Sequence, residues 1–138
     1  MNYFLAKTDP ETYSISDLRR DKQTNWDGVH NYTAILVIKS WKPGDLVLIY
    51  HSQTEKRIVG LAKVIGEPEP DKNDKRGISW MAKLEFIKEF PEEQKITLAQ
   101  VKESGKFNEF ALVKIGRLST MACPPEFVVW LKKKGVLL

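Results

Sequence analysis

The chain has 138 residues, of which 42% are hydrophobic and 29% are charged, so a single globular domain over residues 1–138 is expected and a disordered chain is excluded. Its 22 basic and 18 acidic residues give a formal charge of +4, which leans weakly toward polyanionic partners. A lone cysteine excludes an intrachain disulfide, and no apolar stretch is long enough to cross a bilayer.

The chain opens with MNYFLAKTD, where no basic segment is followed by an apolar run. No secretory signal is therefore expected. Together with the single cysteine, this favours a reducing compartment, and we expect a cytoplasmic protein without a membrane partner.

The first thirty residues predict a strand, a short helix and an ordered loop. Tyr3–Lys7 alternates between apolar and polar side chains and favours a strand. Ser14 or Ser16 can cap a helix over Ile15–Arg20. Gln23–Asn31 is polar and contains an Asp-Gly pair, which indicates a loop.

Residues 32–90 predict a β-rich centre after one ambiguous segment. Tyr32–Trp41 is rich in β-branched residues but also has apolar side chains at helical spacing. A Lys-Pro-Gly-Asp turn then leads into Leu46–His51 and Arg57–Ile65, which are interpreted as a hairpin. Gly66–Gly77 is read as a solvated loop, and Ile78–Phe90 alternates as a long strand.

The last third predicts short elements. Thr97 begins an amphipathic helix through about Glu103, Arg117–Ser119 is read as a brief strand, and a Pro-Pro-Glu sequence begins a final helix that ends near Lys134. Several strands with few, short helices predict a mixed, strongly curved sheet or small barrel with helices at its rim. Such folds often carry ligand sites at the mouth.

Sequence motifs for catalysis are absent. The chain has no phosphate-binding glycine loop, no dinucleotide fingerprint, no nucleophile elbow and no zinc-protease motif. Its two histidines have no spacing that gathers metal ligands, and Cys123 has no base beside it in the sequence. We therefore expect no catalytic residues, no metal and no cofactor, and we do not expect an enzyme.

Three clusters place aromatic side chains beside hydrogen-bonding groups. Trp26–Tyr32 puts an indole next to a glycine, Tyr50–Ser52 ends an apolar strand, and Gly116–Ser119 carries a guanidinium and a hydroxyl. Each cluster also has an ordinary structural reading. Trp26 could belong to the core, the histidine of the second cluster could be a structural hydrogen bonder, and the arginine of the third could pair with an acid at the surface.

In chain order, these clusters match the motifs of the EVE domain family. Lys7–Leu18 resembles the K-[ST]-[ED]-P-x-x-Y-S-x-x-D-L opening of that family, and Trp26–Ala34 is similar to its W-x-G-V-R-N-Y-x-A motif. The Lys42–Asp45 turn, Tyr50–Ser52, the I-V-G-x-A of residues 58–62 and Gly116–Ser119 follow in the family's order. The resemblance covers essentially the whole chain.

The resemblance implies a fold, a function and a set of site residues. The implied fold is of the α/β (α+β) class, a PUA-like curved mixed β pseudo-barrel with flanking short helices, in which the segment matching Asn31–Lys39 is helical. The implied function is recognition of modified bases, such as a modified cytosine or adenine in DNA, without chemistry on them. The positions that fall around the family's pocket are Lys7, Trp26, Asn31, Tyr32, Tyr50, His51, Ser52, Trp80, Arg117 and Ser119.

The chain departs from the family pattern at two places. His30 stands where the family usually has arginine, which removes a permanent charge and predicts a weaker contact there. The segment between Pro70 and Trp80 lacks the tyrosine-rich, proline-containing stretch often found in the family. Part of the usual pocket lid is therefore expected to be missing.

The mechanism expected from these residues is base extrusion. A base inside a duplex presents only its edges, so reading it from all sides requires flipping it out. Trp26 and one of Tyr32, Tyr50 or Trp80 would sandwich the base, and polar groups of the site would read its edge. On this view, Trp26→Ala abolishes base-specific binding and leaves the fold intact.

Several alternatives remain at this stage. The chain could bind a modified or structured RNA, as other PUA-like domains do, or it could be a nucleotide-processing enzyme that uses the same pocket. It could also be a protein-interaction domain whose aromatic residues form only the core. For the DNA reader we expect a monomer that works with an effector protein such as a nuclease.

Overall fold

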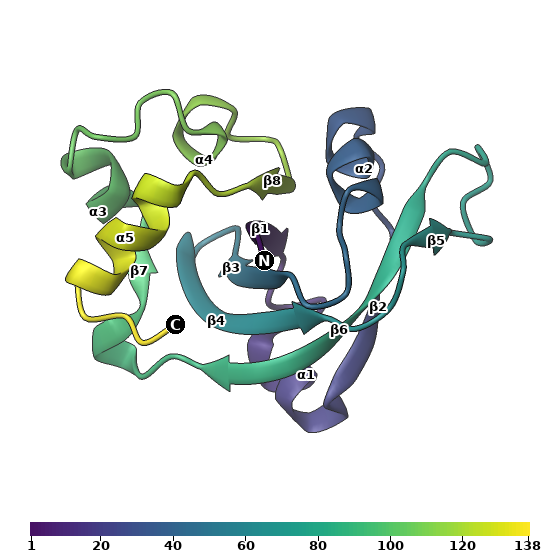
Figure 1. Cartoon of the computed structure of the whole chain (residues 1–138), viewed down its shortest axis with the longest axis horizontal. Coiled ribbons are helices and arrows are strands. Elements are labelled where there is room, and N and C mark those ends of the chain that lie inside the picture. The colour runs from purple at the N-terminus through teal and green to yellow at the C-terminus, as the bar shows by residue number, and fades with distance from the viewer.

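The computed structural model describes all 138 residues and contains one mixed, strongly curved sheet that does not close into a barrel (Figure 1). The hydrogen-bonded order along the sheet is β2-β6-β4-β3-β1-β8, with β5 paired to β6 and β7 paired to β4. The strands are β1 (Tyr3–Thr8), β2 (Gln23–Trp26), β3 (Leu46–His51), β4 (Arg57–Val64), β5 (Glu69–Pro70), β6 (Trp80–Glu89), β7 (Ile96–Thr97) and β8 (Thr120–Ala122). This arrangement confirms the expected mixed α/β class with a curved sheet.

The centre of the sheet consists of β1, β3 and β4. The expected hairpin is present, because β3 pairs antiparallel with β4, and β1 lies parallel to β3 on its other side. Residues Val47–His51 are all buried, so both faces of β3 are covered. The register between β3 and β4 shifts between Ile49 and Tyr50, where β4 carries one extra residue, Val59.

Short helices flank the sheet, namely α1 (Ile15–Asp21), α2 (Tyr32–Lys39), α3 (Leu98–Glu103), α4 (Ala111–Lys114), α5 (Pro125–Lys133) and a single 3₁₀ turn η1 (Glu92–Gln94). Ser14 caps α1 and forms a capping box with Asp17, as one of the two predicted caps. Tyr32–Lys39 is helical, since burial of Ala34, Ile35 and Ile38 on one face outweighs the strand propensity of its β-branched residues.

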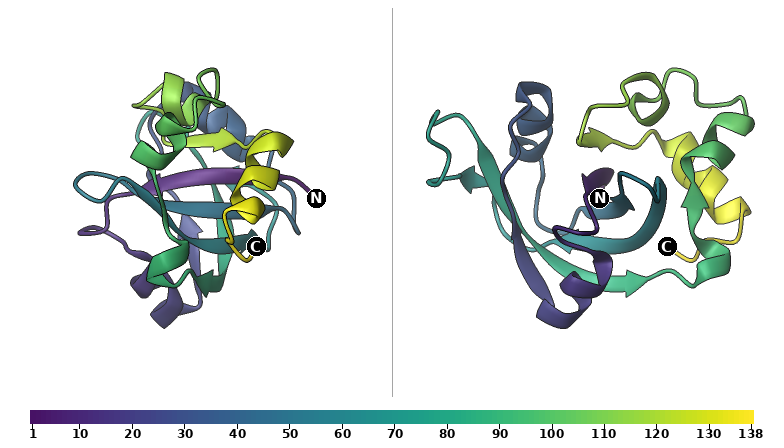
Figure 2. Two further views of the ribbon diagram at one scale, coloured as in Figure 1. Left: turned by 90° about the vertical axis from the view of Figure 1, so that its left-hand side faces the viewer. Right: turned by 180° about the vertical axis from the view of Figure 1, so that it is seen from behind.

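Helices α3, α4 and α5 gather at one end of the molecule, in the views of both Figure 1 and Figure 2. An aromatic cluster joins α5 to the segment that leads into α4. The ring of Phe127 lies 5.1 Å from that of Phe107 and 4.7 Å from that of Phe110, and Trp130 stacks on Phe127 at 5.8 Å. Phe107 and Phe110, just before α4, therefore pack on α5 as part of the hydrophobic core. None of the helices is both long enough and apolar enough to span a membrane.

The structure corrects two of the predicted elements. Gln23–Trp26, expected to be loop, forms β2, because it finds an antiparallel partner in β6 that no local signal reveals. Arg117–Ser119, expected to be a strand, precedes β8, which begins at Thr120. The predicted loop Gly66–Gly77 also contains the two-residue β5.

Gly60 in β4 lets α1 approach the sheet. A Cβ atom at this position would lie 2.6 Å from Cδ1 of Ile15 and 2.7 Å from the carbonyl oxygen of Lys88. Since that oxygen is backbone in β6, we expect Gly60→Ala to lower the free energy of unfolding by about 1–3 kcal/mol. Urea denaturation measures this loss. Gly66→Ala is the control, because its nearest neighbour would be 3.8 Å away; an equal loss there would contradict the steric argument.

Candidate functional site

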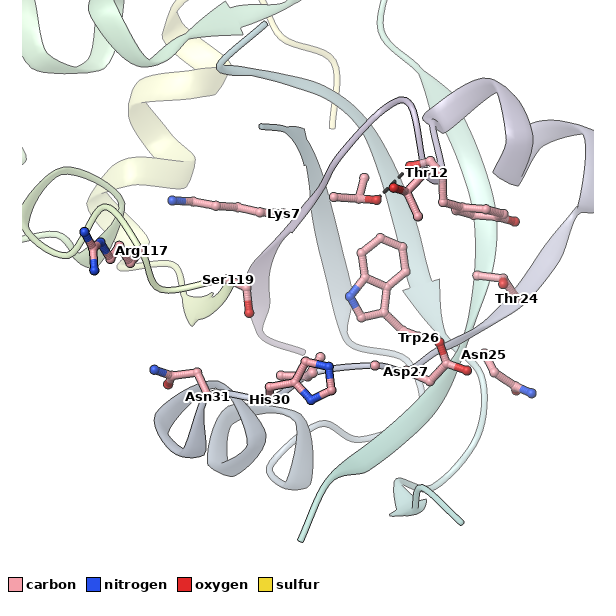
Figure 3. Close-up of a pocket in the computed structure, with 14 residues that line it drawn as sticks. Lys7, Thr12, Thr24, Asn25, Trp26, Asp27, His30, Asn31, Arg117 and Ser119 are labelled. Atoms are coloured by element: carbon pink, nitrogen blue, oxygen red, sulfur yellow. Dashed lines mark hydrogen bonds between the residues drawn. The ribbon is translucent and has the colours of Figure 1, made fainter. Parts of the chain in front are cut away.

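A cavity of about 570 Å³ opens where the end of β1, strand β2 and the segments that precede α2 and β8 meet. Figure 3 shows the indole of Trp26 at the centre of the side chains that line it. Its lining is mostly polar and comes from Lys7, Thr8, Thr12, Tyr13, Thr24, Asn25, Trp26, Asp27, Gly28, Val29, His30, Asn31, Arg117 and Ser119.

Trp26 forms the apolar floor of the cavity. It is the last residue of β2, where it pairs with Ala82 of β6, and only 8% of its surface is exposed. In Figure 3 the ring lies with Ser119 and Asn31 on one side and Thr24 on the other. The indole is thus held by the core, and only a small part of its surface meets the cavity.

The loop after Trp26 is fixed by the segment between β5 and β6. Gly28 adopts φ 70°, a left-handed conformation that suits glycine, and its N–H donates to Asp71 Oδ2 at 3.3 Å. Ser79 Oγ donates to the carbonyl of Val29 at 2.7 Å. The short segment between Pro70 and Trp80 therefore braces the floor of the cavity from behind.

Asn31 and Lys7 each have one polar atom that makes a hydrogen bond within the protein. Asn31 caps α2, since its Oδ1 accepts from the N–H of Ala34 at 3.1 Å, which leaves its amide NH₂ free. The ammonium of Lys7 donates to the carbonyl of Gly116 at 2.9 Å and lies 5.4 Å from the centre of the Tyr50 ring. These contacts tie the end of β1 to the segment that carries Arg117 and Ser119.

The charges around the cavity are unevenly distributed. Burial lowers the pKa of Lys7, and the exposed Arg117 takes part in none of the ion pairs of the structure. Burial, and secondarily repulsion from Asp71, raises the pKa of Asp27. One side of the cavity is therefore cationic, and an acidic group stands on the other.

The remaining candidate residues do not line this cavity. Tyr50 is buried beneath Lys7, and Ser52, just beyond β3, is half-buried outside the cavity. Tyr32, at the start of α2, is 64% exposed. Trp80 is half-buried in β6, where the ammonium of Lys39 lies 4.9 Å from its ring.

His51 is a buried connector between the sheet and α1. Its Nε2 accepts from the N–H of Ile15 at 3.0 Å, and its Nδ1 donates to Glu55 Oε1 at 3.0 Å. Both ring nitrogens are therefore satisfied within the protein. These bonds hold the N-terminus of α1, and with it the rim residues Thr12 and Tyr13.

The sequence matches the family model of the EVE domain over residues 2–133. The chain belongs to the EVE domain family. Among curated proteins it is similar to thymocyte nuclear protein 1 of Rattus norvegicus, with 40% identity over 82 residues, and of Homo sapiens, with 38% identity over 82 residues. These matches cover 51% of this chain and only 36% of the length of each relative.

Solved structures resemble this EVE domain over nearly its whole length. A Rhodopseudomonas palustris protein solved by NMR has a TM-score of 0.88 and 30% identity, covering 100% of this chain and 96% of its own. The human THYN1 protein, solved in complex with 5-methylcytosine containing DNA, has a TM-score of 0.83 and 25% identity, covering 97% of this chain and 98% of its own.

Sequence reasoning missed several residues of the cavity in this EVE domain. Thr12, Tyr13, Thr24, Asn25 and Asp27 all contribute to its wall. Tyr13 lies inside the opening family motif and could have been found there. Thr24 and Asn25 reach the cavity only because β2 pairs with β6, which the local sequence does not indicate.

Proposed function

We propose that this EVE domain is a non-catalytic reader of modified bases in DNA, which holds one extruded base against Trp26. The observation that carries the proposal is an indole anchored in the core that lines a cavity together with hydrogen-bonding side chains. Two further findings support it, namely the family membership and the similarity to the human THYN1 protein, whose structure contains 5-methylcytosine DNA.

The energetics of extrusion fit such a cavity. Flipping a base costs a few kcal/mol, and stacking it on an aromatic ring returns about 1–3 kcal/mol. The remainder must come from hydrogen bonds to the base edge and from phosphate contacts. The cavity, at about 570 Å³, lies within the range usual for small-molecule sites and has room for one base.

The second wall of the stack differs from the one expected from the sequence. Tyr32, Tyr50 and Trp80 do not line the cavity, whereas the rings of Tyr13 and His30 do. We therefore propose Trp26 as the stacking platform, with Tyr13 and His30 at its rim. Asn31 and Ser119 supply polar groups for the edge of the base.

The proposal assigns no chemistry to the site. Burial raises the pKa of the Cys123 thiol, which opposes a nucleophilic thiolate, and this residue does not line the cavity. The hydroxyl of Thr8 donates to the carbonyl of Tyr13 and not to a general base. Such a reader requires an effector protein, such as a nuclease, to act on the DNA that it finds.

The proposal is tested by fluorescence anisotropy with duplexes that differ only in one modified cytosine or adenine. We expect tighter binding to one modified duplex than to its unmodified twin at every salt concentration. Matched RNA oligonucleotides compete in the same assay. Equal binding to all duplexes would refute the base reader, and stronger competition by modified RNA would replace DNA with RNA as the ligand.

Arg117 is expected to contact a phosphate beside the bound base, since it is exposed and takes part in none of the ion pairs of the structure. Arg117→Gln should weaken binding to modified and unmodified duplexes by the same factor. It should also reduce the slope of log K against log salt by about 0.9, the value for one phosphate contact. Arg76→Gln is the control, because Arg76 pairs with Asp74 and lies outside this cavity. A change in base preference would show that Arg117 reads the base instead.

A further inference from the structure

Asp27 is the one acidic residue in the lining of the cavity. The only hydrogen bond to its carboxylate comes from its own backbone. Figure 3 shows the exposed Asp27 on the side of Trp26 that is away from Asn31 and Ser119. The carboxylate oxygens of Asp27 are therefore free to accept a hydrogen bond from a ligand in the cavity that Trp26 also lines.

The neighbouring acids are occupied by the backbone. Asp71 accepts from the N–H of Gly28 through one oxygen and from the N–H of Asn73 through the other. Asp74 accepts from the N–H of Ser79 at 2.7 Å and from that of another loop residue at 3.1 Å. These two carboxylates hold the segment before β6 in place, whereas Asp27 does not hold any other residue.

A carboxylate reads a base differently from the other polar groups of the cavity. The hydroxyl of Ser119 can donate or accept, and the free amide NH₂ of Asn31 can only donate, so neither group selects a base that offers a donor. An ionised Asp27 can only accept. Cytosine and adenine present an exocyclic amine as donor, whereas thymine presents a carbonyl at the same ring position as cytosine's amine.

We propose that Asp27 selects bases with an exocyclic amino group, by accepting a hydrogen bond from that amine while the base lies on Trp26. The proposal rests on the proposed function and adds the residue that determines specificity. Its sharpest consequence concerns 5-methylcytosine and thymine. Both carry the methyl group, so the methyl cannot distinguish them, and the acceptor at Asp27 can.

The surroundings of Asp27 disfavour its ionised form in the folded protein. Burial, and then the charge of Asp71, raises the pKa of Asp27, so its ionisation opposes folding. Below about pH 3.9 the group is protonated in both states and the cost is absent. The free energy of unfolding therefore falls as the pH rises through the raised pKa of Asp27 in the folded state. Asp27→Asn should therefore raise the unfolding temperature at pH 7 and leave it unchanged at pH 3.

The experiment compares 5-methylcytosine with thymine, each placed opposite an abasic site in the same duplex, so that neither base must break a pair before extrusion. Binding is followed by fluorescence anisotropy. We expect the wild type to prefer 5-methylcytosine by about tenfold or more. In Asp27→Asn that preference should vanish, since an amide can also donate to the thymine carbonyl. Glu103→Gln removes the same charge from exposed surface on α3 and should keep the preference.

The outcomes separate this proposal from the function on which it rests. If the wild type binds all modified and unmodified duplexes equally, the base reader itself is refuted. If the wild type prefers 5-methylcytosine over thymine and Asp27→Asn keeps that ratio, only the role of Asp27 is overturned. The unfolding temperature of Asp27→Asn shows that the variant is folded, so a loss of preference cannot be attributed to unfolding.

Discussion

Trp26→Leu is expected to lower the affinity for a modified duplex to that for its unmodified twin. Stacking contributes about 1–3 kcal/mol per base, which corresponds to roughly 5- to 150-fold in affinity. Leucine keeps an apolar floor in the cavity but offers no aromatic face. Anisotropy titrations with the paired duplexes measure the loss. Salt-dependent binding to both duplexes should persist, because the phosphate contacts remain.

The substitution to leucine is chosen because the structure corrects one expectation about Trp26. The sequence suggested that Trp26→Ala would leave the fold intact, but Trp26 belongs to the hydrophobic core and is only 8% exposed. Removing a buried tryptophan to alanine costs about 3–5 kcal/mol, so that variant would confuse unfolding with lost binding. Leucine fills part of the volume and limits this cost.

Trp41→Leu is the matched control for this experiment. Trp41 is also a core residue, 1% exposed, and packs 6.0 Å from the ring of Phe4, away from the cavity. It should lose stability in urea denaturation and keep its preference for the modified duplex. If Trp41→Leu loses that preference as Trp26→Leu does, general destabilisation accounts for both results and the stacking role of Trp26 is wrong.

His51→Leu is expected to destabilise the fold without changing which base is preferred. The substitution leaves the N–H of Ile15 without its acceptor at the start of α1. An unsatisfied buried donor costs about 1–3 kcal/mol, and Glu55 keeps only its bond from Arg57. Urea denaturation measures the loss in free energy of unfolding, and anisotropy on the folded fraction measures the preference.

The His51 and Trp26 variants together distinguish a motif residue that stabilises the fold from one that contacts the ligand. Loss of base preference in a folded His51→Leu variant would show that His51 contacts the ligand and would contradict its assignment as a connector. His51→Gln is the companion variant, because a glutamine amide oxygen can accept from Ile15. It should recover part of the stability if the hydrogen bond to α1 is what matters.

Much of the architecture follows from local sequence. The strand at Tyr3–Thr8, the hairpin of β3 and β4, the long β6 and the cap of α1 by Ser14 all carry strong local signals, such as alternation, turn residues and a capping box. The order of motifs also predicted the EVE domain family, which the family match over residues 2–133 bears out.

Motifs along the chain were enough to predict the family and the mixed α/β class, and they singled out the Trp26 segment, which lines the cavity. Which of the candidate residues lie together could be seen only in the folded chain. Lys7, Trp26, Asn31, Arg117 and Ser119 line one cavity. His51 is turned into the core to hold α1, and the other aromatic candidates lie outside. Motif order fixes neighbours along the chain, whereas the pairing of β2 with β6 and the one-residue bulge in β4 decide which side chains face one space.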